Sequence, residues 1–420
     1  MPVRVPSLRW LVLLAVVLRL AFVAHHASRG WQLQYDAGYY LTLAQHLSHG
    51  VYSLYHPLDI PDTTRMPGYP WLIHLLGSSV PAVLLLQVLL SAANVVLVHR
   101  LAAAIGLPPR GAWLAAVLMA LEPMAIVLSG SLLTETCFTT ALLGGTLLLL
   151  QRPPTWRTLV GAALCFAMAA WLRANGLLLG LAAVGIATVV LRLPVQKGLV
   201  CAAMTVLLVT PWVLRNHAST GRWMLSDSGP VAAAHFHLPE VLAAAHDPHA
   251  RTYRQELHER AARTDWEDRT AAATYFDGLR KDLRHIFLAH PLAWSAVQLR
   301  TAVGILVAPG RGHIANHFGM GPLAKAVSGW SMLYSVLLVC TILICLLRWR
   351  RLPVDVVVLL LLAGAIIWSG GISTTDTRFK APGMPLLLVC AAWAVTAIGS
   401  ARFAIKGGTP GPVPNPARPR

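Results

Sequence analysis

This chain contains few charged residues. Only 12% of its 420 residues are Asp, Glu, Lys or Arg, 56% are hydrophobic, and the mean hydropathy is +0.60. This composition lies outside soluble globular usage and excludes an ordinary soluble enzyme. The six cysteines have no metal-ligand spacing and fall in apolar runs, so no disulfide framework is expected. We find no internal repeat, and the composition indicates a polytopic membrane protein.

Long apolar runs are abundant. A membrane-spanning helix needs about 17 to 25 mostly apolar residues. A further apolar segment, Leu292–Ala308, has Arg300 in its middle, and we predict an interfacial or re-entrant helix there, with an eleventh span as the alternative. The predicted fold class is an all-α polytopic membrane protein with about 10–11 transmembrane helices, amphipathic helices on the outer side and a small helical outer loop domain. The ten predicted spans lie near residues 8–25, 82–99, 111–128, 132–150, 158–172, 176–191, 198–213, 328–347, 354–369 and 383–400.

The formal net charge of +17 arises largely from short loops between apolar runs. With ten spans and a cytoplasmic amino terminus, every short Arg-rich loop lies inside, as the positive-inside rule requires. The basic charge therefore indicates topology and gives no reason to expect a nucleic-acid partner. Arg19 interrupts the first apolar run and no small-x-small cleavage site follows, which predicts an uncleaved signal anchor. We expect a multi-pass protein of the plasma (inner) membrane.

Two loops are too long to be simple connectors, and both fall on the outer side in the ten-span topology. The predicted units are a transmembrane module, 1–213, that includes the first outer loop, 26–81; an outer cap, 214–291; an interfacial helix with the last spans, 292–400; and a disordered cytoplasmic tail, 401–420. The cap holds ten of the seventeen acidic residues. Its segment Arg251–Ala289 is rich in helix formers and predicts two or three helices.

Acidic residues are scarce outside the cap, and carboxylates near a span usually serve a site or lie at its aqueous edge. Asp36 begins a short amphipathic pattern that ends at Gly50, where it is either a helix cap or a carboxylate directed into a cleft above the membrane. Glu135 lies at the outer start of the fourth span, where it either complements the helix dipole or serves a site. We assign no role to Asp59, Asp62 and Asp355. The seven acids outside the cap are Asp36, Asp59, Asp62, Glu122, Glu135, Asp355 and Asp376.

Several basic residues fall on the predicted outer side, contrary to the positive-inside rule. A guanidinium fixed at the membrane edge can bind phosphate oxygens in a bidentate manner, although a single arginine at a span end also snorkels without a ligand. His313 and His317 have i, i+4 spacing but no accompanying carboxylate motif, so we assign no metal site. No cofactor is assigned, and binding of a divalent cation is left open. The outer basic residues are Arg65, Arg173, Arg215, Arg378 and Lys380.

Six short motifs occur in one order along most of the chain, and together they resemble the C-type integral-membrane glycosyltransferases. The similarity is to bacterial family 39-like members such as the protein O-mannosyltransferases and the lipid A aminoarabinose transferase. The motifs are Tyr35-Asp36-x-x-x-Tyr40, Arg65-x-Pro67-Gly68-Tyr69-Pro70, Thr134-Glu135, Arg173-x-Asn175-Gly176, Pro211-Trp212-x-x-Arg215-Asn216 and Arg378-Phe379-x-x-Pro382-x-x-Pro385.

The resemblance implies transfer of a sugar, with inversion, from a polyprenyl-phosphate donor to a lipid, glycan or protein acceptor on the outer face. It maps the general base of the family onto Asp36. Glu135 would orient the acceptor or a bound cation. Donor phosphate would be held by Arg65, Arg173, Arg378 and Lys380, and the substrate cleft would include Tyr35, Tyr40, Tyr69, Glu122 and Arg215.

Two other functions are compatible with the spans and loops. A transporter or flippase for lipid-linked sugars also needs charged groups, but it holds them near the bilayer midplane on broken helices. A noncatalytic subunit of a cell-envelope assembly system would keep the same spans and loops without catalysis.

Overall fold

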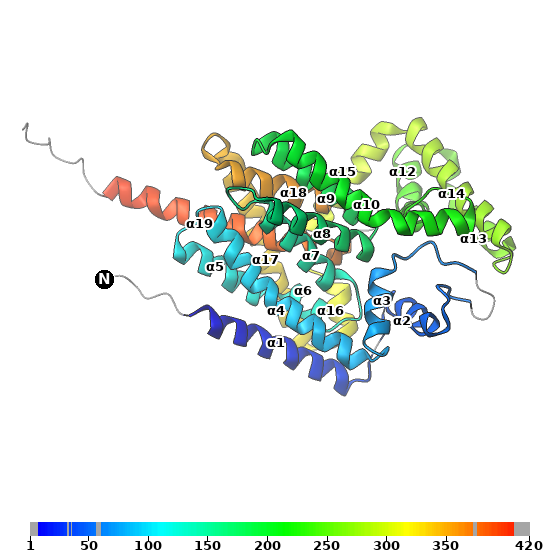
Figure 1. The fold of residues 1–420 in the computed structure, drawn as a ribbon, viewed down its shortest axis with the longest axis horizontal. Coiled ribbons are helices and arrows are strands. Elements are labelled where there is room, and N and C mark those ends of the chain that lie inside the picture. The colour runs from blue at the N-terminus through cyan, green and yellow to red at the C-terminus, as the bar shows by residue number, and fades with distance from the viewer. Residues whose placement is uncertain (1–6, 32, 35, 56–59, 373–375, 407–420) are drawn as a thin grey trace, which may run out of the picture.

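The structure is a computed structural model that describes residues 7–31, 33–34, 36–55, 60–372 and 376–406. Within these ranges every regular element is a helix, so the all-α fold class is confirmed (Figure 1). Tyr35 and Asp59, together with the predicted tail after Lys406, lie outside the described residues.

The α-helices are α1 (Leu8–Ser28), α2 (Ala37–His46), α3 (Gly68–Leu75), α4 (Val80–Ala104), α5 (Pro109–Ala120), α6 (Pro123–Ser129), α7 (Glu135–Leu149), α8 (Trp156–Leu172), α9 (Asn175–Val190), α10 (Val195–Thr220), α11 (Ser228–Ala232), α12 (Leu238–Ala244), α13 (Tyr253–Arg263), α14 (Arg269–Ala289), α15 (Pro291–Val307), α16 (Arg311–Phe318), α17 (Pro322–Leu347), α18 (Val354–Gly370) and α19 (Met384–Lys406). Five short helical segments accompany them: η1 (Leu47–His49), η2 (Ala233–His237), η3 (Pro248–Arg251), η4 (Trp349–Arg351) and η5 (Thr377–Gly383).

The chain is a multi-pass integral membrane protein, and each of the ten predicted spans contains an apolar helix. In the described ranges, five helices are long and apolar enough to cross a bilayer, and two bent helix pairs raise that number to seven. Four shorter apolar helices, α7, α8, α9 and α18, pack among them.

The third predicted span, 111–128, is not one continuous helix. α5 ends at Ala120, α6 begins at Pro123, and their axes differ by 51°. Proline cannot donate the backbone hydrogen bond that would continue a helix, and it disfavours helical geometry in the residue before it. Glu122 accordingly has an extended backbone, and its carboxylate caps α6 by accepting from the Ala125 N–H. Glu122 therefore lies at a break within the third predicted span.

The break leaves carbonyl groups at the end of α5 without helical donors, and a buried arginine on α1 satisfies two of them. Arg19 donates to the Ala120 carbonyl at 3.0 Å, to the Met119 carbonyl at 3.4 Å and to the Ser91 hydroxyl at 2.6 Å. Its side chain is fully buried. Unsatisfied backbone groups are costly in hydrocarbon, so these bonds join α1, α4 and α5.

The segment predicted as interfacial or re-entrant forms the second bent pair. α15 and α16 meet at an angle of 45°, around Gly310 in the left-handed region with φ of +76°. A Cβ at Gly310 would lie 2.8 Å from the Thr377 hydroxyl oxygen and from the Met124 sulfur, which is closer than side chains approach. Glycine is therefore required at this bend by both conformation and space.

The two long loops lie at the same end of the molecule. Figure 1 shows α2 and α3 of the first loop on the same side as the cap helices α12, α13 and α14, whereas the start of α1 and the end of α19 lie at the opposite end. The cap is helical, as predicted, and has its own buried core that includes Leu238, Leu242, Tyr253, Leu257 and Leu279. This arrangement agrees with a topology in which both long loops share one side of the membrane.

We predict that both long loops are outside the cell. In a cysteine-free background, Ser48→Cys in the first loop and Thr270→Cys in the cap should react with a membrane-impermeant maleimide in intact cells, because both positions are exposed. Thr155→Cys, exposed in a short loop between α7 and α8, should react only after permeabilisation. Labelling of Thr155→Cys in intact cells, or protection of the other two, would contradict this topology.

Candidate active site

The first-loop acid, Asp36, lies immediately before α2. It occupies the N-cap position, yet its carboxylate makes no capping hydrogen bond to α2. One oxygen, Oδ1, accepts from Arg65 Nη2 at 3.1 Å, and the other, Oδ2, lies 3.8 Å from Arg378 Nη1. The Asp36 side chain is 35% exposed, against 19% for Arg65 and 14% for Arg378. Asp36 is therefore an accessible carboxylate between two more deeply buried guanidinium groups.

The second acid, Glu135, is the first residue of α7 and is 2% exposed. Its Oε1 accepts from Arg173 Nη1 at 2.8 Å and lies 3.9 Å from Arg378 Nε. Its other oxygen, Oε2, has no hydrogen-bond partner among the described residues. Glu135 thus lies at the amino-terminal end of α7, within 4 Å of two arginine side chains.

Arg378 lies between the two acids and connects them. The resulting series of ion pairs runs Arg65–Asp36–Arg378–Glu135–Arg173, although these residues are distributed from the first loop to the last span. Three arginines from distant segments thus lie around the same pair of carboxylates.

Aromatic rings contact each of these guanidinium groups. The ring centre of Tyr39 lies 4.0 Å from the Arg65 guanidinium carbon, and the ring centre of Phe379 lies 5.2 Å from that of Arg173 and 5.0 Å from that of Arg378. Cation–π contacts of this kind hold a guanidinium plane without consuming its N–H donors. Among the described residues, the Arg65 Nε–H is buried and has no hydrogen-bond partner.

Three other predicted site residues, Tyr40, Tyr69 and Glu122, lie near this group of charged side chains. The Tyr40 ring packs edge-on against the Tyr69 ring at 5.1 Å, and the Tyr69 hydroxyl donates to Gln87 Oε1 at 2.6 Å. Tyr40 is half-buried beside the acids, whereas Tyr69 is fully buried. Glu122 lies beyond Glu135, where both line a small cavity of about 20 Å³ together with Asn94.

Lys380 does not join the arginine group. Its ammonium donates to the carbonyl oxygens of Leu306 and Ala308 at 3.1 and 2.8 Å and to the Ser335 hydroxyl at 3.1 Å. The side chain is 2% exposed. Because Ala308 immediately precedes the bend between α15 and α16, Lys380 stabilises that bend.

Arg215 also has a different place from the one expected for a cleft residue. From α10 it donates to the carbonyl oxygens of Asp62 at 2.9 Å and Tyr52 at 3.2 Å. It therefore holds the backbone of the first outer loop against the end of α10.

Asp62, which was assigned no role, and Asp376, which was not among the predicted site residues, support the arginines. The Asp62 Oδ1 accepts from the backbone N–H of Thr64 at 2.6 Å and of Arg65 at 3.0 Å, which forms an Asx turn just before Arg65. Asp376 Oδ1 accepts from the Arg378 backbone N–H at 3.0 Å and lies 3.0 Å from His313 Nε2. In sequence, the only signal was the position of each acid two or three residues before an arginine.

The hydrogen bond between His313 and Asp376 also affects the protonation of the Asp376 carboxyl group. Burial alone would raise the pKa of Asp376, but the hydrogen bond from His313 and the charges of His313 and Arg378 outweigh burial and lower it below its ordinary value. His317, one turn further along α16, instead contacts the Ser131 hydroxyl at 3.1 Å. Among the described residues, no group of three or more His, Cys, Asp and Glu side chains is arranged to hold a metal ion.

No protein-family model matches this chain, and no curated protein sequence is significantly similar to it. Comparison with solved structures finds the oligosaccharyltransferase of Archaeoglobus fulgidus. Its apo form is 15% identical, with a TM-score of 0.54 over 95% of this chain and 51% of the archaeal protein. A structure of the oligosaccharyltransferase AglB from the same organism, in complex with an inhibitory peptide and a dolichol-phosphate, is 14% identical, with a TM-score of 0.51 over 98% of this chain and 52% of AglB.

A third similar structure is ArnT from Cupriavidus metallidurans bound to undecaprenyl phosphate, 15% identical with a TM-score of 0.43 over 96% of this chain and 82% of ArnT. The present chain spans about half the length of the archaeal oligosaccharyltransferase. At these identities the likeness to the archaeal enzyme establishes a common fold. The fold of the C-type membrane glycosyltransferases, which the sequence motifs predict, is therefore confirmed.

Glu135 should contribute strongly to stability. Replacing it by Gln removes the charge that Arg173 and Arg378 share, and removal of one partner from a buried ion pair costs about 3–5 kcal/mol. We expect about 3 kcal/mol, since Arg173 retains 20% exposure. Unfolding by SDS titration in mixed micelles measures the effect.

The matched control is Glu259→Gln, which breaks the exposed Glu259–Arg263 pair on α13. Such surface pairs contribute about 0.3–0.5 kcal/mol. Equal losses in the two variants would show that the Glu135 pair is not a buried structural ion pair.

Proposed function

We propose that this protein is a membrane glycosyltransferase that transfers a sugar from a polyprenyl-phosphate donor to an acceptor on the outer face of the membrane. The observation that carries the proposal is the accessible carboxylate of Asp36 beside Arg65 and Arg378, with Arg173 joined to them through Glu135. Attack on an anomeric carbon needs a base for the acceptor hydroxyl and cationic groups for the departing phosphate. The cluster contains both.

In the proposed reaction, Asp36 accepts the proton of the acceptor hydroxyl while that oxygen attacks the anomeric carbon. The bond from this carbon to the phosphate oxygen breaks on the opposite face, so the anomeric configuration inverts. Arg65, Arg173 and Arg378 stabilise the negative charge on the leaving polyprenyl phosphate. Glu135 holds Arg173 and Arg378 in position.

The arginines retain capacity for this role although carboxylates already contact them. A guanidinium has five N–H donors in a planar fork, and it can bind a carboxylate along one edge and a phosphate along another. Lys380 has no part in the proposal, because three protein oxygens already accept from its ammonium.

The placement of the charges favours an enzyme over a flippase or transporter. Asp36 precedes α2, Glu135 begins α7, Arg173 follows α8 and Arg378 lies in η5 before α19, so all of them occupy helix ends. Transporters hold their coupling charges near the bilayer midplane on interrupted helices. A noncatalytic subunit is distinguished by the substitution described next.

Asp36→Asn should abolish most of the transfer while the protein still folds. Asn preserves the size of the side chain but cannot act as a base, and general-base catalysis contributes about 10²–10⁴-fold. We expect a fall of that size in sugar transfer from a labelled polyprenyl-phosphate donor by purified protein in detergent. Donor binding, measured separately, should persist because the arginines remain.

The control is Asp355→Asn, which makes the same chemical change in the Arg152–Asp355 pair at the start of α18. It should transfer at the wild-type rate. Wild-type transfer by Asp36→Asn would remove Asp36 from the proposed mechanism, and persistence of biological function without any transfer activity would favour the noncatalytic subunit.

A further inference from the structure

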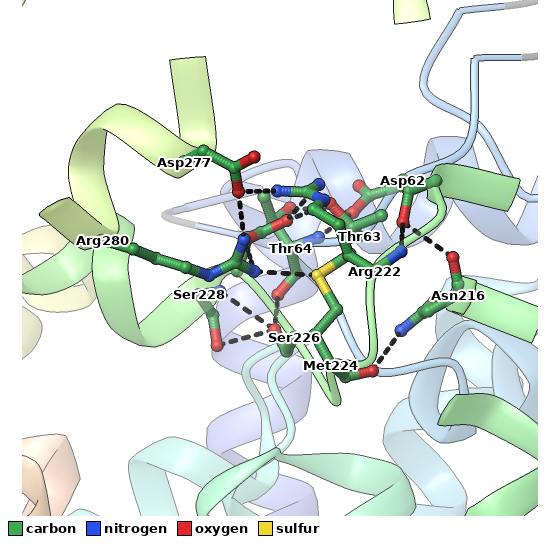
Figure 2. A network of polar contacts seen from close by, with 12 residues as sticks. Asp62, Thr63, Thr64, Asn216, Arg222, Met224, Ser226, Ser228, Asp277 and Arg280 are labelled. Atoms are coloured by element: carbon green, nitrogen blue, oxygen red, sulfur yellow. Dashed lines mark hydrogen bonds and ion pairs between the residues drawn. The ribbon is translucent and has the colours of Figure 1, made fainter. Parts of the chain in front are cut away.

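The cap and the first outer loop are joined by a compact polar contact between residues far apart in sequence. Figure 2 shows Thr63 and Thr64 of the first loop beside Arg222, Ser226 and Arg280 of the cap. The Ser226 hydroxyl donates to the Thr64 carbonyl oxygen at 2.7 Å. This contact lies directly before Arg65 in the chain.

The centre of this contact is Asp227, whose side chain is fully buried. Its Oδ2 accepts from the Thr63 hydroxyl at 2.6 Å and from Arg222 Nη2 at 3.3 Å, and its Oδ1 accepts from Arg280. Its backbone N–H donates to the Thr63 carbonyl oxygen at 2.8 Å. Thr63 is thus held through both its side chain and its backbone.

The same segment is held from the other side by Asp62 and Arg215. Asp62 forms the Asx turn over Thr64 and Arg65, and Arg215 fixes the Asp62 carbonyl oxygen. The Thr64 hydroxyl then accepts from Arg65 Nη1 at 2.8 Å. Hydrogen bonds at Thr63 and at Thr64, which are neighbours in the chain, thus connect Asp227 to the Arg65 guanidinium, which donates to Asp36.

The arginines of the contact do not depend on Asp227 alone. Asp277 on α14 accepts from Arg222 Nη1 at 3.1 Å and from Arg280 Nη1 at 2.8 Å. The cap also has its own apolar core. A change at Thr63 or Asp227 can therefore weaken the joint between cap and loop while the cap itself stays folded.

We propose that Asp227 and Thr63 are positioning residues, which dock the cap on the first loop and thereby hold Arg65 beside Asp36 for binding of the donor phosphate. This inference rests on the proposed function. It assigns to the cap a role in the reaction, although none of the cap residues named in the joint contacts Asp36. The chemistry is that of a buried carboxylate: it is stable only if its hydrogen bonds are complete, so it fixes the geometry of every donor around it.

The test compares Thr63→Val with Thr63→Ser. Both residues are close to threonine in size, but only serine keeps the hydroxyl that donates to Asp227. A hydrogen bond to a buried charged group is worth roughly a tenfold change in an equilibrium. In Thr63→Val we expect the donor KM to rise about tenfold with a smaller change in kcat, and amide hydrogen exchange at Thr64 and Arg65 to accelerate by a similar factor. In Thr63→Ser, the donor KM and the amide exchange at Thr64 and Arg65 should stay close to their wild-type values.

A second pair of variants tests the cap side of this contact. Asp227→Ala should raise the donor KM further, up to about 10²-fold, because misplacement of a catalytic group by an ångström has effects of that size. Its control, Asp282→Ala, breaks the Arg260–Asp282 pair inside the cap, which does not contact the first loop. It should leave the donor KM and the exchange at Arg65 unchanged.

Equal KM and exchange in Thr63→Val and Thr63→Ser would overturn the inference, even if Asp227→Ala fails to fold. Faster exchange without a rise in KM would also overturn it, because the position of Arg65 would then not govern donor binding. If the wild-type protein transfers no sugar, the proposed function fails separately. Amide hydrogen exchange at Arg65 then tests the positioning role by itself. Faster exchange in Thr63→Val would support the positioning of Arg65, and unchanged exchange would overturn it.

Discussion

The arrangement of the candidate site depends on the attraction between Arg378 and two carboxylates, those of Asp36 and Glu135. Arg378 belongs to the last membrane segment, Glu135 to α7 and Asp36 to the first outer loop, so this one side chain relates three separate parts of the chain. Ionised groups at the edge of hydrocarbon are stable only when they are paired and hydrogen-bonded. The same electrostatic requirement that holds the helices together therefore keeps an accessible carboxylate and several cations at fixed positions.

Such a site is organised before any substrate enters. The carboxylates and guanidinium groups already have partners, and aromatic rings fix the guanidinium planes, so the proposed binding of a donor phosphate would need little reorganisation. The accessible face of Asp36 contrasts with the buried position of Glu135, which separates an acid suited to contact an acceptor from an acid suited to hold arginines. Two carboxylates in one cluster thus differ because their surroundings differ.

Much of this organisation could be predicted from the sequence, because acids and outer arginines are so few that each one was informative. The fold class, the helical cap and the helix after Asp36 followed from apolar run length, helix propensity and periodicity. The support from Asp62 and Asp376 did not follow, since an Asx turn resembles any polar loop when its partner is unknown. The contact of Asp227 with Thr63 spans 164 positions, and no local pattern encodes it. Lys380 was grouped with Arg378 because the two lie close in sequence, but helical geometry directs it to the bend between α15 and α16.

The bonds from Arg19 to the end of α5 have a consequence for biosynthesis. An arginine within an apolar helix costs about 2.5–3.5 kcal/mol on insertion scales, and the Met119 and Ala120 carbonyl oxygens that receive this one emerge from the ribosome about a hundred residues later. Until then, α1 must keep its guanidinium near water or lipid headgroups. Stable insertion of α1 into the bilayer therefore depends on synthesis of α5. If synthesis stopped before α5, α1 would be less stable within the membrane.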